Sequence, residues 1–176
     1  RRAMATPFGR APDPRRGGWD ATAPWILPAV WAEIEFDNSA SSEDAVVVFG
    51  LGGGDAGVAP LLLDGAVGIG RQGTEGFATT SKSGGRVFCG FSLESCFQKD
   101  LSVLRPHWLG TAVGIAWTVP AGAVGRFPLA LGWYHHGVAT TGLVTYYGYT
   151  RIWNGLEGIL SEAVATREDA FRISEL

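Results

Sequence analysis

The sequence predicts a mainly β protein: an antiparallel, supersandwich-like β-sandwich followed by a C-terminal helical linker. Short apolar runs with a period of two recur between residues 28 and 134, as in half-buried strands. Turn-forming residues separate these runs at short intervals. After Thr141 the apolar residues recur at three- and four-residue steps, which indicates helix. The chain has 176 residues, 46% hydrophobic and 18% charged, which is enough to bury a core.

Residues 1–25 are predicted to form an extended segment, because each proline of Ala11-Pro12-Asp13-Pro14 restricts the residue before it to extended geometry. A solvated edge explains the arginines of this segment better than a phosphate site, which would need a helix or interleaved aromatic residues; they are Arg1, Arg2, Arg10, Arg15 and Arg16. The net charge of −3 and the lack of a basic stripe argue against nucleic acid as a partner. Because the chain begins with Arg1 rather than Met, we expect a fragment or a processed product.

Residues 26–140 are predicted to form the sandwich domain. Residues 28–36 alternate between apolar and polar, and residues 45–49 form a short β-branched run that is typical of a strand buried on both faces. Further strands are predicted over residues 87–91, 111–119 and 127–134. Residues 55–85 are rich in glycine and show no clear period, so the sequence places no strand there with any precision.

Residues 141–176 are predicted to form the helical linker. Apolar side chains recur along one face over residues 143–164, although three glycines weaken this helix by about 1 kcal/mol each relative to alanine. Thr166-Arg167-Glu168-Asp169 resembles a capping box that opens a second helix. No apolar run approaches the roughly 18 residues of a membrane span, and the N-terminus lacks the apolar stretch of a signal peptide. We therefore expect no membrane partner and a cytoplasmic location.

Two patterns have both a chemical and a structural interpretation. The segment 52–57 matches the nucleotide-binding pattern G-x-G-x-x-G, but Pro60 and Asp64-Gly65 leave too little room for the helix that a pyrophosphate needs. A turn between strands explains it better. Glu33 and Glu35 point to the same face of a strand, and a glycosidase needs two carboxyls roughly 5–10 Å apart. The polar outer face of an amphipathic strand is the preferred explanation for this pair.

Histidine and cysteine give no metal or cofactor site. His135 and His136 are neighbours that point to opposite faces of a strand, and His107 is the third histidine, so we expect no metal. His135 and His136 are weak candidates for substrate contact, and loop histidines bonded to the backbone are the alternative. Two cysteines, Cys89 and Cys96, are fewer ligands than a zinc site needs. The sequence does not decide whether they are free thiols or form a disulfide. We also expect no cofactor, because no catalytic set is visible in this chain.

Several short motifs occur in an order and spacing that together are specific. They are Pro12-Asp13-Pro14, Pro28-Ala29-Val30 with Glu33 and Asp37-Asn38, Val119-Pro120-Ala121-Gly122, Thr140-Thr141-Gly142, Tyr146, Tyr149-Thr150-Arg151 and Ala170-Phe171-Arg172. This series resembles the N-terminal β-sandwich domain of glycoside hydrolase family 52 β-xylosidases, over about residues 7–176. The sequence departs from the family pattern in the glycine-rich stretch 52–85 and at Tyr134-His135-His136.

The resemblance implies a two-domain retaining enzyme that removes terminal β-1,4-xylosyl residues from xylo-oligosaccharides. Its Glu nucleophile and Asp acid/base lie in an α/α barrel beyond this chain, so no catalytic residue is assigned here. The implied partners are that C-terminal barrel domain and, through it, the xylo-oligosaccharide; a homodimer is compatible with the sequence. We expect four residues of the linker to contact the barrel: Tyr146, Tyr149, Arg151 and Trp153.

Two alternatives stay open. A carbohydrate-binding β-sandwich module would use exposed Trp or Tyr side chains to stack on sugar rings. The sandwich domain of a related bile-acid-type β-glucosidase family would have a similar architecture and a different substrate. Sugar binding by the isolated chain favours the first alternative, and the coding sequence beyond Leu176 distinguishes the second.

Overall fold

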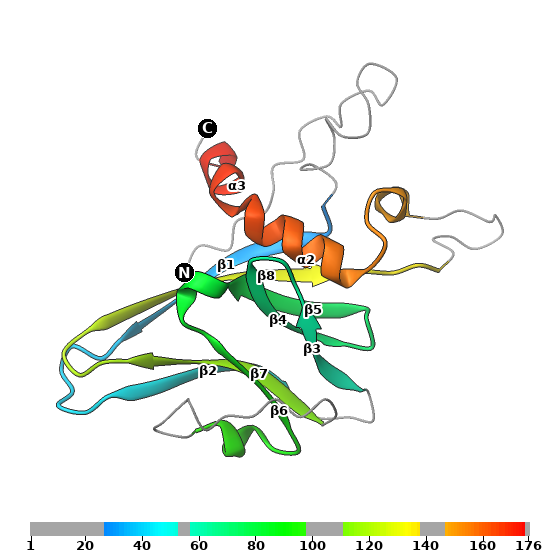
Figure 1. The fold of residues 1–176 in the computed structure, drawn as a ribbon. Helices are drawn as coiled ribbons and strands as arrows, with labels where there is room; N and C mark the ends of the chain where they lie inside the picture. The colour runs from blue at the N-terminus through cyan, green and yellow to red at the C-terminus, as the bar shows by residue number, and fades with distance from the viewer. Residues whose placement is uncertain (1–26, 53–56, 98–110, 138–146, 175–176) are drawn as a thin grey trace.

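The fold is a two-sheet antiparallel sandwich with a helix packed on the outside of the larger sheet (Figure 1). It is seen in a computed structural model that describes residues 27–52, 57–97, 111–137 and 147–174. Sheet A has the strand order β1-β8-β5-β4-β3, and sheet B has the order β2-β7-β6. The strands are β1 Ala29–Asp37, β2 Ala45–Gly52, β3 Val58–Leu62, β4 Ala66–Arg71, β5 Glu75–Thr80, β6 Arg86–Gly90, β7 Ala112–Val119 and β8 Val124–Trp133. The helices are η1 Ser81–Ser83, η2 Leu93–Cys96, η4 Gly148–Arg151, α2 Leu156–Ala165 and α3 Arg167–Ser174.

The main core lies between the two sheets and confirms the predicted sandwich. Alternate residues of each strand point inward, as the period of two requires. Phe49 of sheet B meets Phe77 of sheet A edge to face, with ring centroids 4.6 Å apart. Trp117 of sheet B stacks on Phe127 of sheet A at 4.8 Å. The remaining buried members of this core are Val58, Ile69, Cys89, Val113, Ile115, Val119 and Leu129.

One buried asparagine joins the two sheets at their turns. Asn38 follows β1 of sheet A and is almost fully buried. Its side-chain amide lies within hydrogen-bond distance of the carbonyls of Glu43, Val119 and Pro120, at 2.9, 3.2 and 3.0 Å. Because these carbonyls belong to the β1–β2 connection and to the β7–β8 turn, Asn38 fixes both crossings between the sheets. Burying its amide without these partners would cost about 1–3 kcal/mol.

A second packed layer lies on the opposite face of sheet A, where α2 covers the sheet (Figure 1). This face consists of small residues, which let the helix approach closely; they are Gly70, Gly76, Ala78, Ala130 and Gly132. The helix buries its apolar side completely through Leu156, Ile159, Leu160 and Ala163. The indole Nε1 of Trp31 in β1 donates to the carbonyl of Ala163 at 2.7 Å, so the helix is also hydrogen-bonded to the sheet.

The glycine-rich stretch contains three strands that the sequence did not locate. β3, β4 and β5 form an antiparallel meander, and β5 pairs with β8 to complete sheet A. In the described structure β3 pairs with β4 alone and is therefore an edge strand. Pro60 lies at its centre, where a residue without a backbone N–H is tolerated at an edge. Leu62 at its end is 84% exposed.

The predicted helix over residues 143–164 is wrong in its extent. Residues 143–146 lie outside the described residues, and η4 is followed by a bend before α2 begins at Leu156. Gly155 has a φ of 155°, a conformation that favours glycine and separates the two helical pieces. The second predicted helix is confirmed as α3. The hydroxyl of Thr166 donates to the carbonyl of Glu162 at 2.8 Å, within the last turn of α2.

No helix in the described parts of the chain combines the length and the apolar character that crossing a bilayer would require. The predicted N-terminal segment 1–25, with its arginines, lies outside the described residues, and so does His107. Of the segment 52–57, the described ends are the last residue of β2 and Gly57, which precedes β3.

Candidate functional site

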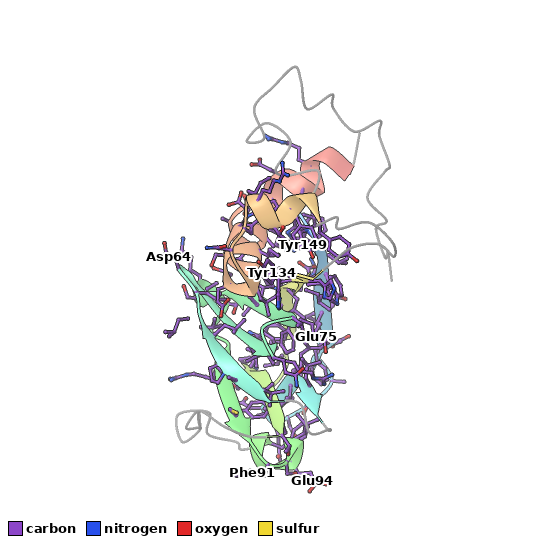
Figure 2. All side chains as sticks on the ribbon, turned by 90° about the vertical axis from the view of Figure 1, so that its right-hand side faces the viewer. Asp64, Glu75, Phe91, Glu94, Tyr134 and Tyr149 are labelled. Atoms are coloured by element: carbon purple, nitrogen blue, oxygen red, sulfur yellow. The ribbon has the colours of Figure 1, made fainter. Side chains whose placement is uncertain are left out.

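Aromatic side chains gather at the end of β8, where the chain leaves sheet A. We call this surface the aromatic end; its residues are Trp133, Tyr134, His135, His136, Tyr147 and Tyr149. Figure 2 looks onto this end, and Tyr134 and Tyr149 lie close together there, between the sheets and the helices. The first four residues follow one another along β8 and beyond it, while the two tyrosines come from η4 and the residue before it.

Ring contacts and hydrogen bonds hold the aromatic end together. Tyr149 meets Tyr134 edge to face at 6.2 Å and stacks on Tyr147 at 5.6 Å. The His135 ring meets Tyr147 at 5.5 Å, and the His136 ring stacks on Tyr134 at 6.0 Å. The backbone N–H of His135 donates to the Tyr149 hydroxyl at 2.9 Å, and that hydroxyl lies 3.3 Å from the His135 carbonyl. The chain that enters α2 is therefore fastened to the chain that leaves β8.

The two histidines are exposed at this surface. Their ring centroids are 6.4 Å apart, and each ring also contacts a tyrosine of the cluster. In the described residues no three side chains of the His, Cys, Asp and Glu types gather closely enough to hold a metal ion. The site can therefore offer ring faces and imidazole hydrogen bonds to a partner.

One residue of the aromatic end, Trp133, lies on the sandwich side of sheet A beside an ion pair. Trp133 pairs across the strands with Glu75, and Glu75 pairs with Arg71. These three face the same side as the core residues two positions before or after them, because side chains alternate along a strand. The Arg71 Nη1 lies 2.9 Å from the Glu75 Oε1. Trp133 is 44% exposed, so the shorter sheet B leaves this row partly open to solvent.

The four residues predicted to contact another domain have different positions. Tyr149 belongs to the aromatic end and is half-buried, and Arg151 is exposed at the end of η4. Trp153 is only 7% exposed and packs against Leu27 and Ala130 of its own chain. It was grouped with Tyr149 because one continuous helix was assumed. Tyr146 lies outside the described residues.

Sequence reasoning missed Tyr147 as a neighbour of His135 and the Arg71–Glu75 pair as a neighbour of Trp133. Tyr147 precedes η4 and did not match the assumed helical face. Arg71 and Glu75 flank the β4–β5 turn inside the glycine-rich stretch, where no strand was placed. The available signal was the local i,i+4 pairing of opposite charges around Gln72-Gly73, a pair that can close a hairpin turn.

The carboxylates of β1 have structural partners. The Oε2 of Glu33 lies 3.0 Å from the Nη2 of Arg167, and the Oε2 of Glu35 lies 2.8 Å from the Nη2 of Arg126. Both glutamates are exposed on the outer side of sheet A, which confirms the interpretation as a polar outer face.

Cys89 is a buried free thiol whose Sγ lies 3.6 Å from the Val58 carbonyl oxygen, and burial raises the pKa of this thiol.

Comparison with known proteins identifies what the whole chain is similar to. The sequence profile of glycosyl hydrolase family 52 matches residues 2–176. A beta-xylosidase from Geobacillus stearothermophilus is 26% identical over 179 aligned residues, which cover 97% of this chain and 25% of that protein. The chain therefore spans about a quarter of the length of the curated relative it matches.

Proposed function

Because this chain belongs to glycosyl hydrolase family 52, we propose that it is the N-terminal, non-catalytic sandwich of a retaining β-xylosidase. In this proposal the sandwich supports a helical-barrel domain, outside this chain, that removes terminal β-1,4-xylosyl residues from xylo-oligosaccharides. The barrel carries the nucleophile and the acid/base, which a retaining mechanism holds only about 5–5.5 Å apart.

One observation carries the non-catalytic role: the two neighbouring glutamates of β1 are each bound to a separate arginine. Glu33 and Glu35 hold Arg167 and Arg126, and they lie on an exposed strand face. A retaining pair needs one carboxylate free to attack the sugar carbon and one protonated carboxyl facing it. An arginine Nη2 lies beside the Oε2 of each glutamate, so each carboxylate already has a partner within the chain and is not placed as one of a catalytic pair.

The aromatic end is the surface through which we expect the sandwich to contact the barrel. Exposed aromatic residues and arginine are the side chains that contribute most at protein interfaces. Tyr147 is 39% exposed, and Arg151 is exposed on the adjoining η4. Tyr149 fixes this surface rigidly through its bonds to His135, so little conformational entropy is lost when a partner binds.

Activity measurements on separate parts test the assignment. We expect the purified chain to release no product from an aryl β-xyloside, and we expect the polypeptide encoded after Leu176, mixed with the chain, to release it. Turnover by the chain alone would contradict the proposal.

Substitutions at the aromatic end test the contact. Tyr147→Ser should weaken association with the barrel polypeptide at least tenfold, because a central interface aromatic contributes upwards of about 2 kcal/mol. Phe91→Ser is the matched control, since Phe91 is 77% exposed and lies at the far end of the sandwich from Tyr149 (Figure 2). Equal association of both variants would place the barrel elsewhere.

A carbohydrate-binding module is the second candidate, and the exposed ring of Trp133 favours it. The ring lies beside the Arg71–Glu75 ion pair, whose remaining donor and acceptor positions could bind sugar hydroxyls while a pyranose stacks on the indole. This candidate predicts saturable heat when xylotriose is titrated into the chain, and loss of that heat in Trp133→Ala. If the sandwich only supports the barrel, xylotriose titration should give no heat of binding that depends on Trp133.

A further inference from the structure

A cavity of about 380 Å³ lies at the corner between α2 and α3, on the outer face of sheet A. We call it the corner cavity. Its lining residues come from both sides of the junction between α2 and α3, which can be followed in Figure 1, and from η1, β5 and β8. None of the residues of the aromatic end therefore takes part in it. Its volume is at the lower end of the range of small-molecule pockets.

Apolar residues with small side chains form the floor of the corner cavity. Ala78 of β5 and Ala130 of β8 are buried beneath it, and Pro128 lies beside them. Val164 and Ala165 of α2 form the wall above. The hydroxyl of Thr79 is already used, because it donates to the Pro128 carbonyl at 2.6 Å. Because Ala78 and Ala130 are 0% and 2% exposed, the apolar surface that a ligand can reach comes from Pro128, Val164 and Ala165.

The rim of the corner cavity carries charges of both signs. Asp169 pairs with Arg172 at 2.8 Å and Arg167 pairs with Glu33 at 3.0 Å, so these groups have partners. Lys82 and Glu168 are exposed, and neither has an ion-pair partner within the described residues. A free ammonium donates and a free carboxylate accepts hydrogen bonds, and both types are stronger than neutral ones.

This combination selects a class of ligand. The lining includes Lys82 and Arg167 as well as Glu168 and Asp169, so its balanced charge favours neither an anion nor a cation. The charged rim disfavours a purely apolar ligand, which would desolvate those charges without hydrogen bonds in return. A neutral polyhydroxylated ligand fits both requirements, since its ring can lie on Pro128 and Ala165 while its hydroxyls donate to Glu168 and accept from Lys82.

We propose that the corner cavity is a secondary binding site for a short, neutral oligosaccharide of pyranose units. The choice of a β-1,4-xylosyl chain as that oligosaccharide rests on the proposed function; the site itself rests on the cavity and its rim. The site is separate from catalysis and from the aromatic end, and it gives the sandwich a role of its own in holding substrate near the enzyme.

Calorimetric titration of xylobiose into the chain tests the proposal. We expect saturable binding that weakens about tenfold in Lys82→Met and in Glu168→Gln, because each removes one charge-assisted hydrogen bond. Ala165→Trp, which fills the cavity from an exposed position, should abolish the binding. Glu157→Gln is the matched control, because Glu157 is exposed on the first turn of α2 and does not line the cavity.

The outcomes separate this proposal from the others. Absence of binding, unchanged affinity in both rim variants, or loss of binding in Trp133→Ala alone would each overturn the corner site. Thermal melting shows whether each variant is folded. If Ala165→Trp does not fold, Lys82→Met and Glu168→Gln still test the site, because both positions are exposed. Hydrolysis of a xyloside by the chain alone would refute the non-catalytic role but not the corner site. If the xylobiose titration gives no heat while the chain still associates with an active barrel polypeptide, the corner site alone is refuted.

Discussion

Replacing Gly76 by alanine probes how closely α2 and two strands of sheet A approach one another. Gly76 lies in β5, directly opposite Gly70 of β4 and beneath α2. A Cβ atom built there would lie 2.2 Å from the carbonyl oxygen of Ile69 and 3.1 Å from the Cδ2 of Leu156. Ordinary contacts begin at 3.4 Å, so the backbone of β4 would have to move by more than an ångström. The side chain of Leu156 would have to move as well.

The expected loss follows from two opposing terms. Alanine is intrinsically better than glycine inside a strand by about 0.5–1 kcal/mol. Overpacking a filled core costs about 1–3 kcal/mol, and here the obstacle is a paired backbone that cannot rotate away. The backbone obstacle places the clash at the upper end of that range, so after the gain from alanine we expect Gly76→Ala to lower the free energy of unfolding by about 2 kcal/mol. For a chain of this length that corresponds to a fall in Tm of about 4–8 °C.

Thermal unfolding followed by circular dichroism measures the effect. Gly57→Ala is the matched control, because a Cβ at Gly57 meets nothing within 4 Å. It should leave Tm unchanged or raise it slightly, since alanine restricts the unfolded chain. If Gly76→Ala melts within about 2 °C of the unsubstituted chain, α2 and β4 do not approach β5 as closely as described.

Three further predictions concern single side chains. Trp31→Phe should destabilise the chain by about 1–3 kcal/mol in guanidinium titration, because the buried Ala163 carbonyl loses its donor; an unchanged midpoint would show that α2 does not depend on this bond. Hydrogen bonds from the Ser39 side chain and backbone hold the pKa of Asp37 below its ordinary value. The Asp37 carboxylate therefore stabilises the fold fully at pH values above the ordinary pKa, and this stabilisation is lost as the pH falls through the lowered pKa. Asp37→Asn should therefore flatten the acid limb of the stability–pH curve, and an unaltered limb would contradict this. Because burial raises the pKa of the Cys89 thiol, a Cys96→Ser variant should react with a thiol reagent at mildly alkaline pH only as fast as it unfolds; rapid native-state labelling would show an accessible thiol.

The strands whose apolar and polar residues alternate were predictable from the sequence. The predicted runs 28–36 and 111–119 correspond to β1 and β7 within one or two residues at each end. The run 45–49 marked the first half of β2, and the run 127–134 marked most of β8. In β1 exposed and less exposed residues alternate, which leaves a visible period, whereas β2 and β7 were marked by short continuous apolar runs.

The strands of the glycine-rich stretch could not be predicted by the same reasoning. In β4 the residues facing the sandwich core are Val67 and Ile69, and they alternate with Gly68 and Gly70. These glycines leave room for side chains on the other side of the sheet: Leu63 approaches Gly68, and Leu61 and Leu156 approach Gly70. Glycine is neither clearly apolar nor polar, so glycines at every second position hide the period of two. A strand that is buried on both faces then has the sequence pattern of a loop. Only the position of α2, which the sequence does not give, explains the pattern.

The candidate site was predicted in part, through the unusual run Tyr134-His135-His136. The contact with Tyr147 and Tyr149 could not be foreseen, because it depends on the bend at Gly155 that brings η4 back over the end of β8. A continuous helix would have placed Trp153 and Tyr149 on one face. The bend instead directs Trp153 into its own core and leaves Tyr147 at the surface.

Pro60 sets a limit on how two copies of this protein can associate. A dimer that continued sheet A past β3 would need backbone donors along that strand, and the central position of five residues has none. The two chains could then form only a broken ladder, so the exposed Leu62 does not turn this edge into a template for self-assembly. Association of two copies through a continuous sheet would have to use another edge strand, which is β1 in sheet A and β2 or β6 in sheet B.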